Sequence, residues 1–113
     1  MASLYFNPAC SKCRTAQSLL AEAGVEADLV RYLDAAPSVE DLRGLMAMLG
    51  VDDPRAMMRT GEAVYAGLGL DGVTGDDLLR AIAANPILLE RPIFVRDGRA
   101  VIARPPERVR ELL

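Results

Sequence analysis

The stretch that decides the fold lies near the N-terminus and reads Leu4-Tyr5-Phe6-Asn7-Pro8-Ala9-Cys10-Ser11-Lys12-Cys13. Its first three residues predict a short apolar strand, which ends at Asn7-Pro8. From Cys13 to Ala23, apolar residues recur at helical spacing, and Gly24 is typical of the end of a helix. A strand that passes through a short turn into a helix predicts an α/β fold in which Cys10 lies at the start of that helix.

The rest of the chain predicts three further strands and several helices. Strands are expected at residues 27–33, 92–95 and 100–102, and Asp97-Gly98 between the last two is a strong hairpin signal. Helices are expected at residues 38–50, 54–59 and 74–85, and from Pro105-Pro106 onward with Val109, Leu112 and Leu113 as apolar positions. A β-α-β crossover makes its strands parallel, whereas a hairpin makes them antiparallel. The sequence therefore predicts one α/β domain over residues 1–113, with a four-stranded mixed sheet and a helical insertion at about residues 38–84.

Composition limits the class of protein. The chain has 113 residues, of which 51% are hydrophobic and 26% charged, and this fits one globular domain. Its net charge of −3 argues against a nucleic-acid binder, and no apolar run approaches the roughly 20 residues of a membrane span. The start, Met1-Ala2-Ser3, lacks the pattern of a signal peptide. We therefore expect a cytoplasmic protein that binds neither nucleic acid nor a membrane.

Positive charge is concentrated towards the C-terminus. Residues 91–113 contain six arginines and three acidic residues, whereas residues 1–90 carry more acidic than basic side chains. This segment predicts a local site for a small anion. The spacing of Arg96, Arg99, Arg108 and Arg110 is also typical of a solvated face.

The sequence contains no histidine and only two cysteines, Cys10 and Cys13. The absence of histidine excludes Ser-His-Asp and Cys-His nucleophile activation and any His-ligated zinc, and two cysteines are too few for a four-thiolate zinc site. We expect no metal and no bound cofactor. A Cys-x-x-Cys pair near the start of a cytosolic α/β chain is typical of redox or nucleophilic chemistry.

Cys10 is the candidate nucleophile of this pair. At a helix N-terminus, unpaired backbone N–H groups and the helix dipole stabilise a thiolate and lower the pKa of cysteine. Cys13 lies about one turn into the helix, where it is more shielded, and is the candidate resolving thiol. Lys12 and Arg14 add positive charge that would help to hold an anion.

The chain resembles the glutaredoxin-coupled arsenate reductases. The resemblance is carried by five segments along nearly the whole chain: Tyr5-Phe6-Asn7-Pro8-Ala9-Cys10-Ser11-Lys12-Cys13-Arg14, Arg31-Tyr32-Leu33, Met57-Met58-Arg59, Asn85-Pro86-Ile87-Leu88-Leu89-Glu90-Arg91-Pro92-Ile93 and Ala103-Arg104-Pro105. It implies a thioredoxin-like fold with a helical insertion, in agreement with the pattern of strands and helices.

The resemblance also implies a set of roles. Cys10 corresponds to the nucleophile that attacks arsenate, and Arg59, Arg91 and Arg104 correspond to the arginines that bind the oxyanion. Glutathione is the implied co-substrate: it attacks the thiol-arsenate adduct, arsenite is released, and glutaredoxin clears the mixed disulfide. The Arg91–Pro92 peptide bond should be cis and lie beside the sulfur.

Two positions depart from the family pattern. Phe6 stands where family members usually have a histidine, so Cys10 would be activated by arginines and the helix N-terminus alone. Cys13 stands where they usually lack a cysteine. A Cys-x-x-Cys pair also occurs in thiol-disulfide oxidoreductases and in the Spx-type regulators, which bind RNA polymerase. A thiol-disulfide oxidoreductase and a redox-sensing polymerase adaptor therefore remain alternatives to an arsenate reductase.

Overall fold

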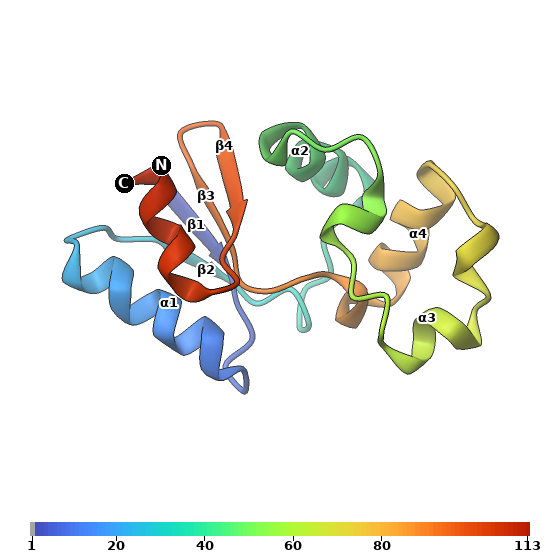
Figure 1. Cartoon of the computed structure of the whole chain (residues 1–113), viewed down its shortest axis with the longest axis horizontal. Helices are drawn as coiled ribbons and strands as arrows, with labels where there is room; N and C mark the ends of the chain where they lie inside the picture. The colour runs from blue at the N-terminus through green and yellow to red at the C-terminus, as the bar shows by residue number, and fades with distance from the viewer. Residues whose placement is uncertain (1) are drawn as a thin grey trace. The chain divides into compact units, whose positions relative to one another are not determined.

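The computed structural model describes residues 2–113, and the chain folds into two units (Figure 1). The first unit is built from the chain up to Ala35 and from Arg91 onward, and the second from Ala36–Glu90. Both cysteines belong to the first unit. Along residues 2–113, no helix has the length and apolar character needed to cross a membrane.

A four-stranded mixed sheet forms the first unit, with the strand order β2-β1-β3-β4. Strand β1 (Ala2–Tyr5) pairs in parallel with β2 (Asp28–Val30) and antiparallel with β3 (Ile93–Arg96), which pairs antiparallel with β4 (Arg99–Ile102). The mixed sheet that the sequence predicts is confirmed.

The β3–β4 hairpin follows from the chemistry of its turn. Asp97 has φ 51° and Gly98 has φ 80°. A two-residue type I′ hairpin turn requires positive φ at both positions, and Asp-Gly is among the few pairs that adopt it readily. The turn fixes the register in which Phe94 pairs with Val101.

Two helices cover one face of this sheet. Leu4, Phe94 and Val101 are neighbours across β1, β3 and β4, so their side chains project from the same face. This row packs with residues of α1 (Ser11–Glu22) and of the C-terminal 3-10 helix η4 (Pro106–Leu112), which also contact each other. The resulting core consists of Leu4, Phe6, Cys13, Ala16, Leu20, Phe94, Val101, Ala103 and Val109.

Helix α1 starts two residues earlier than the apolar spacing predicts, at Ser11, with Cys10 as its N-cap. Ser11 and Lys12 are exposed, so hydrophobic periodicity could not detect the first turn. At the other end, Gly24 adopts φ 74° directly after the C-cap, as expected for a glycine there. The early start places Cys10 at the open end of the helix.

The second unit is helical. Helix α2 (Val39–Leu49) begins with a capping box: Ser38 Oγ accepts from the Asp41 N–H at 3.0 Å, and Asp41 Oδ2 accepts from the Ser38 N–H at 3.2 Å. Gly50 ends the helix at φ 72°. The further elements are η1 (Pro54–Met57), α3 (Ala63–Gly67), η2 (Leu70–Gly72), α4 (Asp76–Ala84) and η3 (Pro86–Leu88).

Three details differ from the sequence-based expectations. Strand β2 ends at Val30 rather than near Leu33, and Tyr32 beyond it is wholly buried. The C-terminal helix is a 3-10 helix, and Leu113 is 49% exposed rather than part of an apolar face. Helix α3 was not expected from the sequence, because five residues are too few to show helical periodicity.

Candidate active site

Cys10 lies in the turn between β1 and α1. Its backbone N–H donates to the Asn7 carbonyl at 2.9 Å, and its own carbonyl accepts from the Arg14 N–H at 3.2 Å, which begins the helix. The Asn7 side chain holds the turn by accepting from the Ala9 N–H at 3.0 Å. The thiol is partly exposed, and the predicted place of Cys10 at a helix N-terminus is confirmed.

The pKa of Cys10 is lowered from 9.0 to about 7. Burial opposes ionisation, but hydrogen bonds to the sulfur outweigh it: they come from the Cys13 backbone and thiol, the Arg91 guanidinium and the Lys12 backbone. Two of these donors are N–H groups of the first turn of α1, which have no partner inside the helix. Cys10 is therefore more readily ionised near neutral pH than an ordinary cysteine.

Cys13 is the opposite kind of thiol. It is 0% exposed and belongs to the core of the first unit. Burial, and then the neighbouring Cys10 sulfur, raise the pKa of Cys13 to about 11, although the Asn7 backbone and the Arg91 charge favour ionisation. The pair thus consists of a partly exposed thiol with a lowered pKa and a buried thiol with a raised pKa, and the predicted shielding of Cys13 is confirmed.

Arg91 is the cation of the site. The Arg91–Pro92 bond is cis, as predicted, and the guanidinium hydrogen bonds to Cys10. The carbonyl of Arg91 accepts from Arg104 Nη1 at 2.9 Å, so the two arginines are joined. The Arg104–Pro105 bond is also cis, which was not predicted. The structure brings Cys10, Cys13, Arg91 and Arg104 into one unit.

Tyr32 is a member of this group that the sequence analysis did not single out. It is 0% exposed, and burial together with the nearby thiols raises its pKa to about 12, against the charge of Arg91. Within residues 2–113, its hydroxyl and Arg91 Nε are buried without a hydrogen-bond partner. In the sequence it lies within the strand expected at residues 27–33, and no pattern there marks it as part of a site.

Two further predicted site residues, Arg59 and Arg14, hydrogen bond to groups other than the cysteines. Arg59 belongs to the second unit, where its Nε donates to Glu62 Oε1 at 3.0 Å and its backbone N–H donates to the Leu88 carbonyl at 2.7 Å. Arg14 is exposed and donates to the Pro8 carbonyl at 3.1 Å, so it stabilises the turn that carries Cys10. Their roles in binding an oxyanion stay predictions.

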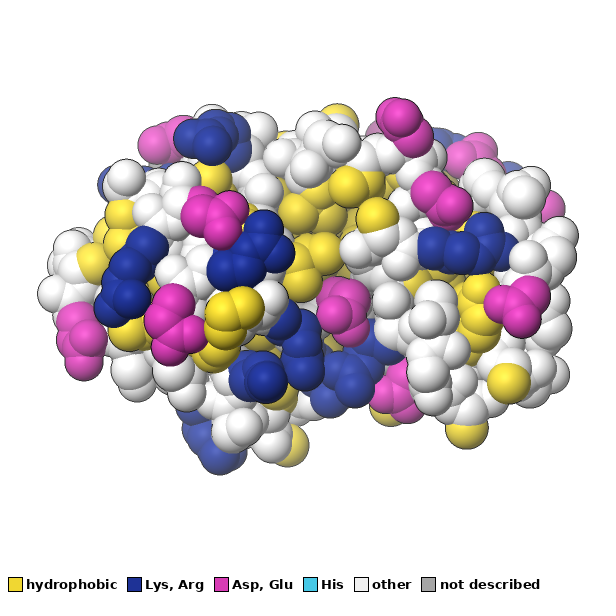
Figure 2. All heavy atoms as spheres, in the orientation of Figure 1, with side chains coloured by type: hydrophobic (Ala, Val, Ile, Leu, Met, Phe, Trp, Pro, Cys, Tyr) yellow, Lys and Arg dark blue, Asp and Glu magenta, His cyan; other side chains and the backbone are white. Residues whose placement is uncertain are grey.

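Other arginines of the C-terminal segment lie on the surface. Arg108 pairs with Glu111 at 2.8 Å, and Arg96 lies 3.9 Å from Asp97. In the first unit, at the left of Figure 2, basic and acidic side chains lie next to one another. These pairs fit a solvated face, whereas Arg91 hydrogen bonds to Cys10 and Arg104 donates to the Arg91 carbonyl.

Phe6 is 5% exposed and belongs to the core, so the position usually held by histidine contributes no ionisable group. Among residues 2–113, no three His, Cys, Asp or Glu side chains gather in a way that could hold a metal ion. The groups that can take part in catalysis are therefore the Cys10 thiolate and the Arg91 guanidinium beside it.

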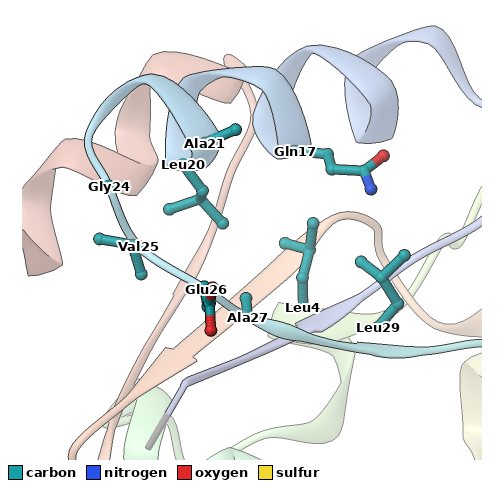
Figure 3. Close-up of a pocket in the computed structure, with 9 residues that line it drawn as sticks. All are labelled: Leu4, Gln17, Leu20, Ala21, Gly24, Val25, Glu26, Ala27 and Leu29. Carbon is teal, nitrogen blue, oxygen red and sulfur yellow. The ribbon is translucent and has the colours of Figure 1, made fainter.

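A cavity of about 470 Å³ lies apart from the cysteines, between α1 and the segment that leads into β2. Figure 3 shows Leu4 and Leu20 projecting into it from β1 and α1, with Gln17 and Glu26 among its polar lining residues. None of its lining residues is a cysteine or an arginine. It therefore takes no part in the candidate active site.

The sequence is similar to those of known proteins. The model of the ArsC family matches residues 5–112. The arsenate reductase of Neisseria meningitidis serogroup A is 45% identical over 112 residues, covering 97% of this chain and 96% of that protein. The arsenate reductase of Escherichia coli K12 is 34% identical over 113 residues, covering 98% of this chain and 79% of that protein.

Solved structures share the fold. The arsenate reductase from Vibrio cholerae matches with a TM-score of 0.95 at 45% identity, covering 99% of this chain and 97% of that one. The four-stranded mixed sheet with its helices is the thioredoxin-like fold of these reductases, as expected. With a family match over nearly all its residues and arsenate reductases as relatives, the chain belongs to the ArsC family.

Proposed function

We propose that this chain is an arsenate reductase in which the Cys10 thiolate attacks arsenate. The observation that carries the proposal is the pairing of a Cys10 thiol of pKa about 7 with the Arg91 guanidinium. The thiolate is the nucleophilic form of cysteine, and an anionic substrate needs positive charge beside an anionic nucleophile. The arsenate reductases among its relatives support the same reaction.

In the first step, Cys10 Sγ forms a bond to arsenic, and one oxygen of arsenate leaves as water after taking up protons. Arg91, which hydrogen bonds to Cys10, is the first proposed ligand of the oxyanion, and Arg104 and Arg59 are the further ones. A guanidinium binds two oxygens of a phosphate-like anion at once. An anion bound at Arg91 would also supply the acceptor that buried Nε lacks, and an unpaired buried donor is costly.

Glutathione is the proposed source of electrons, with glutaredoxin as the protein that returns the cysteine to its reduced form. The reaction needs two electrons from thiols to convert arsenate to arsenite. A reducing cytoplasm supplies such thiols. No bound cofactor is part of the proposal.

The experiment is an assay of arsenate-dependent glutathione oxidation in the presence of glutaredoxin. The protein should turn over arsenate, and Cys10→Ser should lose all activity because no thiolate remains. Ser18→Ala, an exposed change on the same helix, is the matched control and should keep the activity. Absence of turnover at millimolar arsenate with an active glutaredoxin system would contradict the proposal.

A thiol-disulfide oxidoreductase is the second candidate function. The contrast between a Cys10 pKa of about 7 and a Cys13 pKa of about 11 favours it, because dithiol enzymes combine a reactive thiol with a protonated one. Such an enzyme would reduce insulin disulfides in the same preparation that fails to reduce arsenate. The two functions are therefore separated by running both assays on one sample.

A further inference from the structure

We propose that Cys13 is the thiol that releases arsenite, by attacking Cys10 Sγ in the arsenic adduct and leaving a Cys10–Cys13 disulfide. The inference rests on the proposed function, because it concerns the second step of that reaction. Glutathione and glutaredoxin would then act on this disulfide rather than on the adduct.

The two cysteines are spaced for such a bond. Cys10 is the N-cap of α1 and Cys13 is its third residue. Residues three apart on a helix have Cβ atoms about 5–6 Å apart, against about 3.5–4.5 Å across a disulfide. The backbone of Cys10 is extended rather than helical, with φ −92° and ψ 121°. A rotation at this one residue can therefore bring the sulfurs together while α1 stays intact.

Burial restricts the partner of Cys13 to Cys10. Cys13 is 0% exposed in the core of the first unit, whereas Cys10 is partly exposed and packs against that same core. A soluble thiol or disulfide can reach Cys10 but not Cys13. A group held beside its target reacts as if present at roughly 10⁵–10⁸ M when it is well oriented. Cys13 would thus attack the adduct before external glutathione does.

The charges around Cys13 set the order of the two steps. Burial is the first cause of its raised pKa, and the hydrogen bond and charge of the Cys10 sulfur are further causes. The charge of the Cys10 thiolate is gone once its sulfur is bonded to arsenic, whereas burial still raises the pKa of Cys13. The Asn7 backbone and the charge of Arg91 remain, and both favour a Cys13 thiolate. Cys13 therefore stays protonated until Cys10 has reacted.

The release step needs no reactant other than the arsenic adduct of Cys10 and the Cys13 thiol. The Cys13 proton passes to an oxygen of the departing arsenite as Cys13 Sγ bonds to Cys10 Sγ. The sulfur–arsenic bond breaks, and its electron pair stays on arsenic, which is reduced from As(V) to As(III). The two thiols are oxidised to one disulfide. A thiol reductant, here glutathione with glutaredoxin, restores them in a separate reaction.

The test is a single turnover without soluble thiol. Reduced protein, freed of reductant under anaerobic conditions, is mixed with excess arsenate, and the arsenite formed and the thiols left are counted. The wild type should release close to one arsenite per chain, lose both thiols and lose the mass of two hydrogens. Cys13→Ser and Cys13→Ala should release at least ~10-fold less, since no oriented second thiol is present.

Added glutathione should restore arsenite release by both Cys13 variants and leave glutathione attached to Cys10, which intact mass spectrometry detects. Ala16→Ser is the matched control, because Ala16 is 0% exposed one turn further along α1. It adds a hydroxyl to the same core and should still release arsenite in the absence of soluble thiol. If Cys13→Ser fails to fold, Cys13→Ala and peptide mapping of the wild-type disulfide decide the matter.

Two results would overturn different claims. If the wild type releases arsenite only when glutathione is present and carries glutathione on Cys10, the role of Cys13 is wrong and the proposed function stands. If no arsenite forms even with glutathione and glutaredoxin, the proposed function itself is wrong.

Discussion

Cys10 is surrounded by several donors, of which Arg91 alone carries a full charge. Arg91→Gln should therefore raise the pKa of Cys10 by about 1, since an opposite charge at contact distance commonly shifts a pKa by about 1–3. The helix N–H groups remain and keep the pKa below 9.0. Alkylation of Cys10 by iodoacetamide across pH measures the change.

Arg99→Gln is the matched control for this residue. It removes the same charge from an exposed position at the tip of the β3–β4 hairpin, at the other end of β3 from Pro92. Its alkylation profile should equal that of the wild type. An equal shift in both variants would mean that the net charge of the protein, rather than the Arg91 contact, sets the pKa of Cys10.

At the scale of the element, α2 depends on its capping box. Ser38→Ala removes the acceptor of the Asp41 N–H and should lower the free energy of unfolding by about 1 kcal/mol, as losses of N-cap residues do. Urea unfolding followed by circular dichroism measures the loss, and Ser38→Thr should recover most of it. An unchanged midpoint for Ser38→Ala, equal to that of Ser18→Ala on the exposed side of α1, would show that the box contributes nothing.

Elements with strong local signals were predictable, and those without them were not. Ser38 and Gly50 mark both ends of α2, and Asp97-Gly98 marks the hairpin, so local chemistry alone places them. Helix α3 has five residues and buries only Tyr65, so it shows no period to detect. The end of β2 is set by tertiary packing: the chain leaves the sheet after Val30, and no local signal records this.

At the scale of the whole molecule, the site residues also divide into those that local sequence predicts and those that only the fold brings together. Cys10 was predictable because its motif and helix are contiguous in the sequence, and so was the shielding of Cys13. The joining of Arg104 to Arg91 depends on segments that only the fold brings together, and the resemblance to a family was needed to select these arginines. Tyr32 was missed because its burial beside Arg91 is a property of the fold alone.

For the molecule as a whole, the side chains whose pKa is shifted in the folded protein predict how the free energy of unfolding depends on pH. The pKa of Cys10 is about 7 in the folded chain and 9.0 as its ordinary value, so its contribution is present above pH 9 and is lost as pH falls to 7. The pKa of Cys13 is raised from 9.0 to about 11, so its contribution is present below pH 9 and is lost as pH rises to 11. Tyr32 adds a loss between pH 10 and about 12.

The free energy of unfolding should therefore rise between pH 7 and 9 by up to about 2 kcal/mol and fall again at higher pH. The carboxyl groups whose pKa is lowered, such as those of Asp76 and Glu111, titrate only in the acid range and leave this window unchanged. Urea unfolding of the reduced protein across the alkaline range tests the profile. Cys10→Ser should remove the rise, whereas Cys13→Ala, which removes only one of the donors to the Cys10 sulfur, should reduce the rise without abolishing it and should weaken the later fall. A rise that persists in Cys10→Ser would mean that another group, and not the thiolate at the start of α1, links folding to pH.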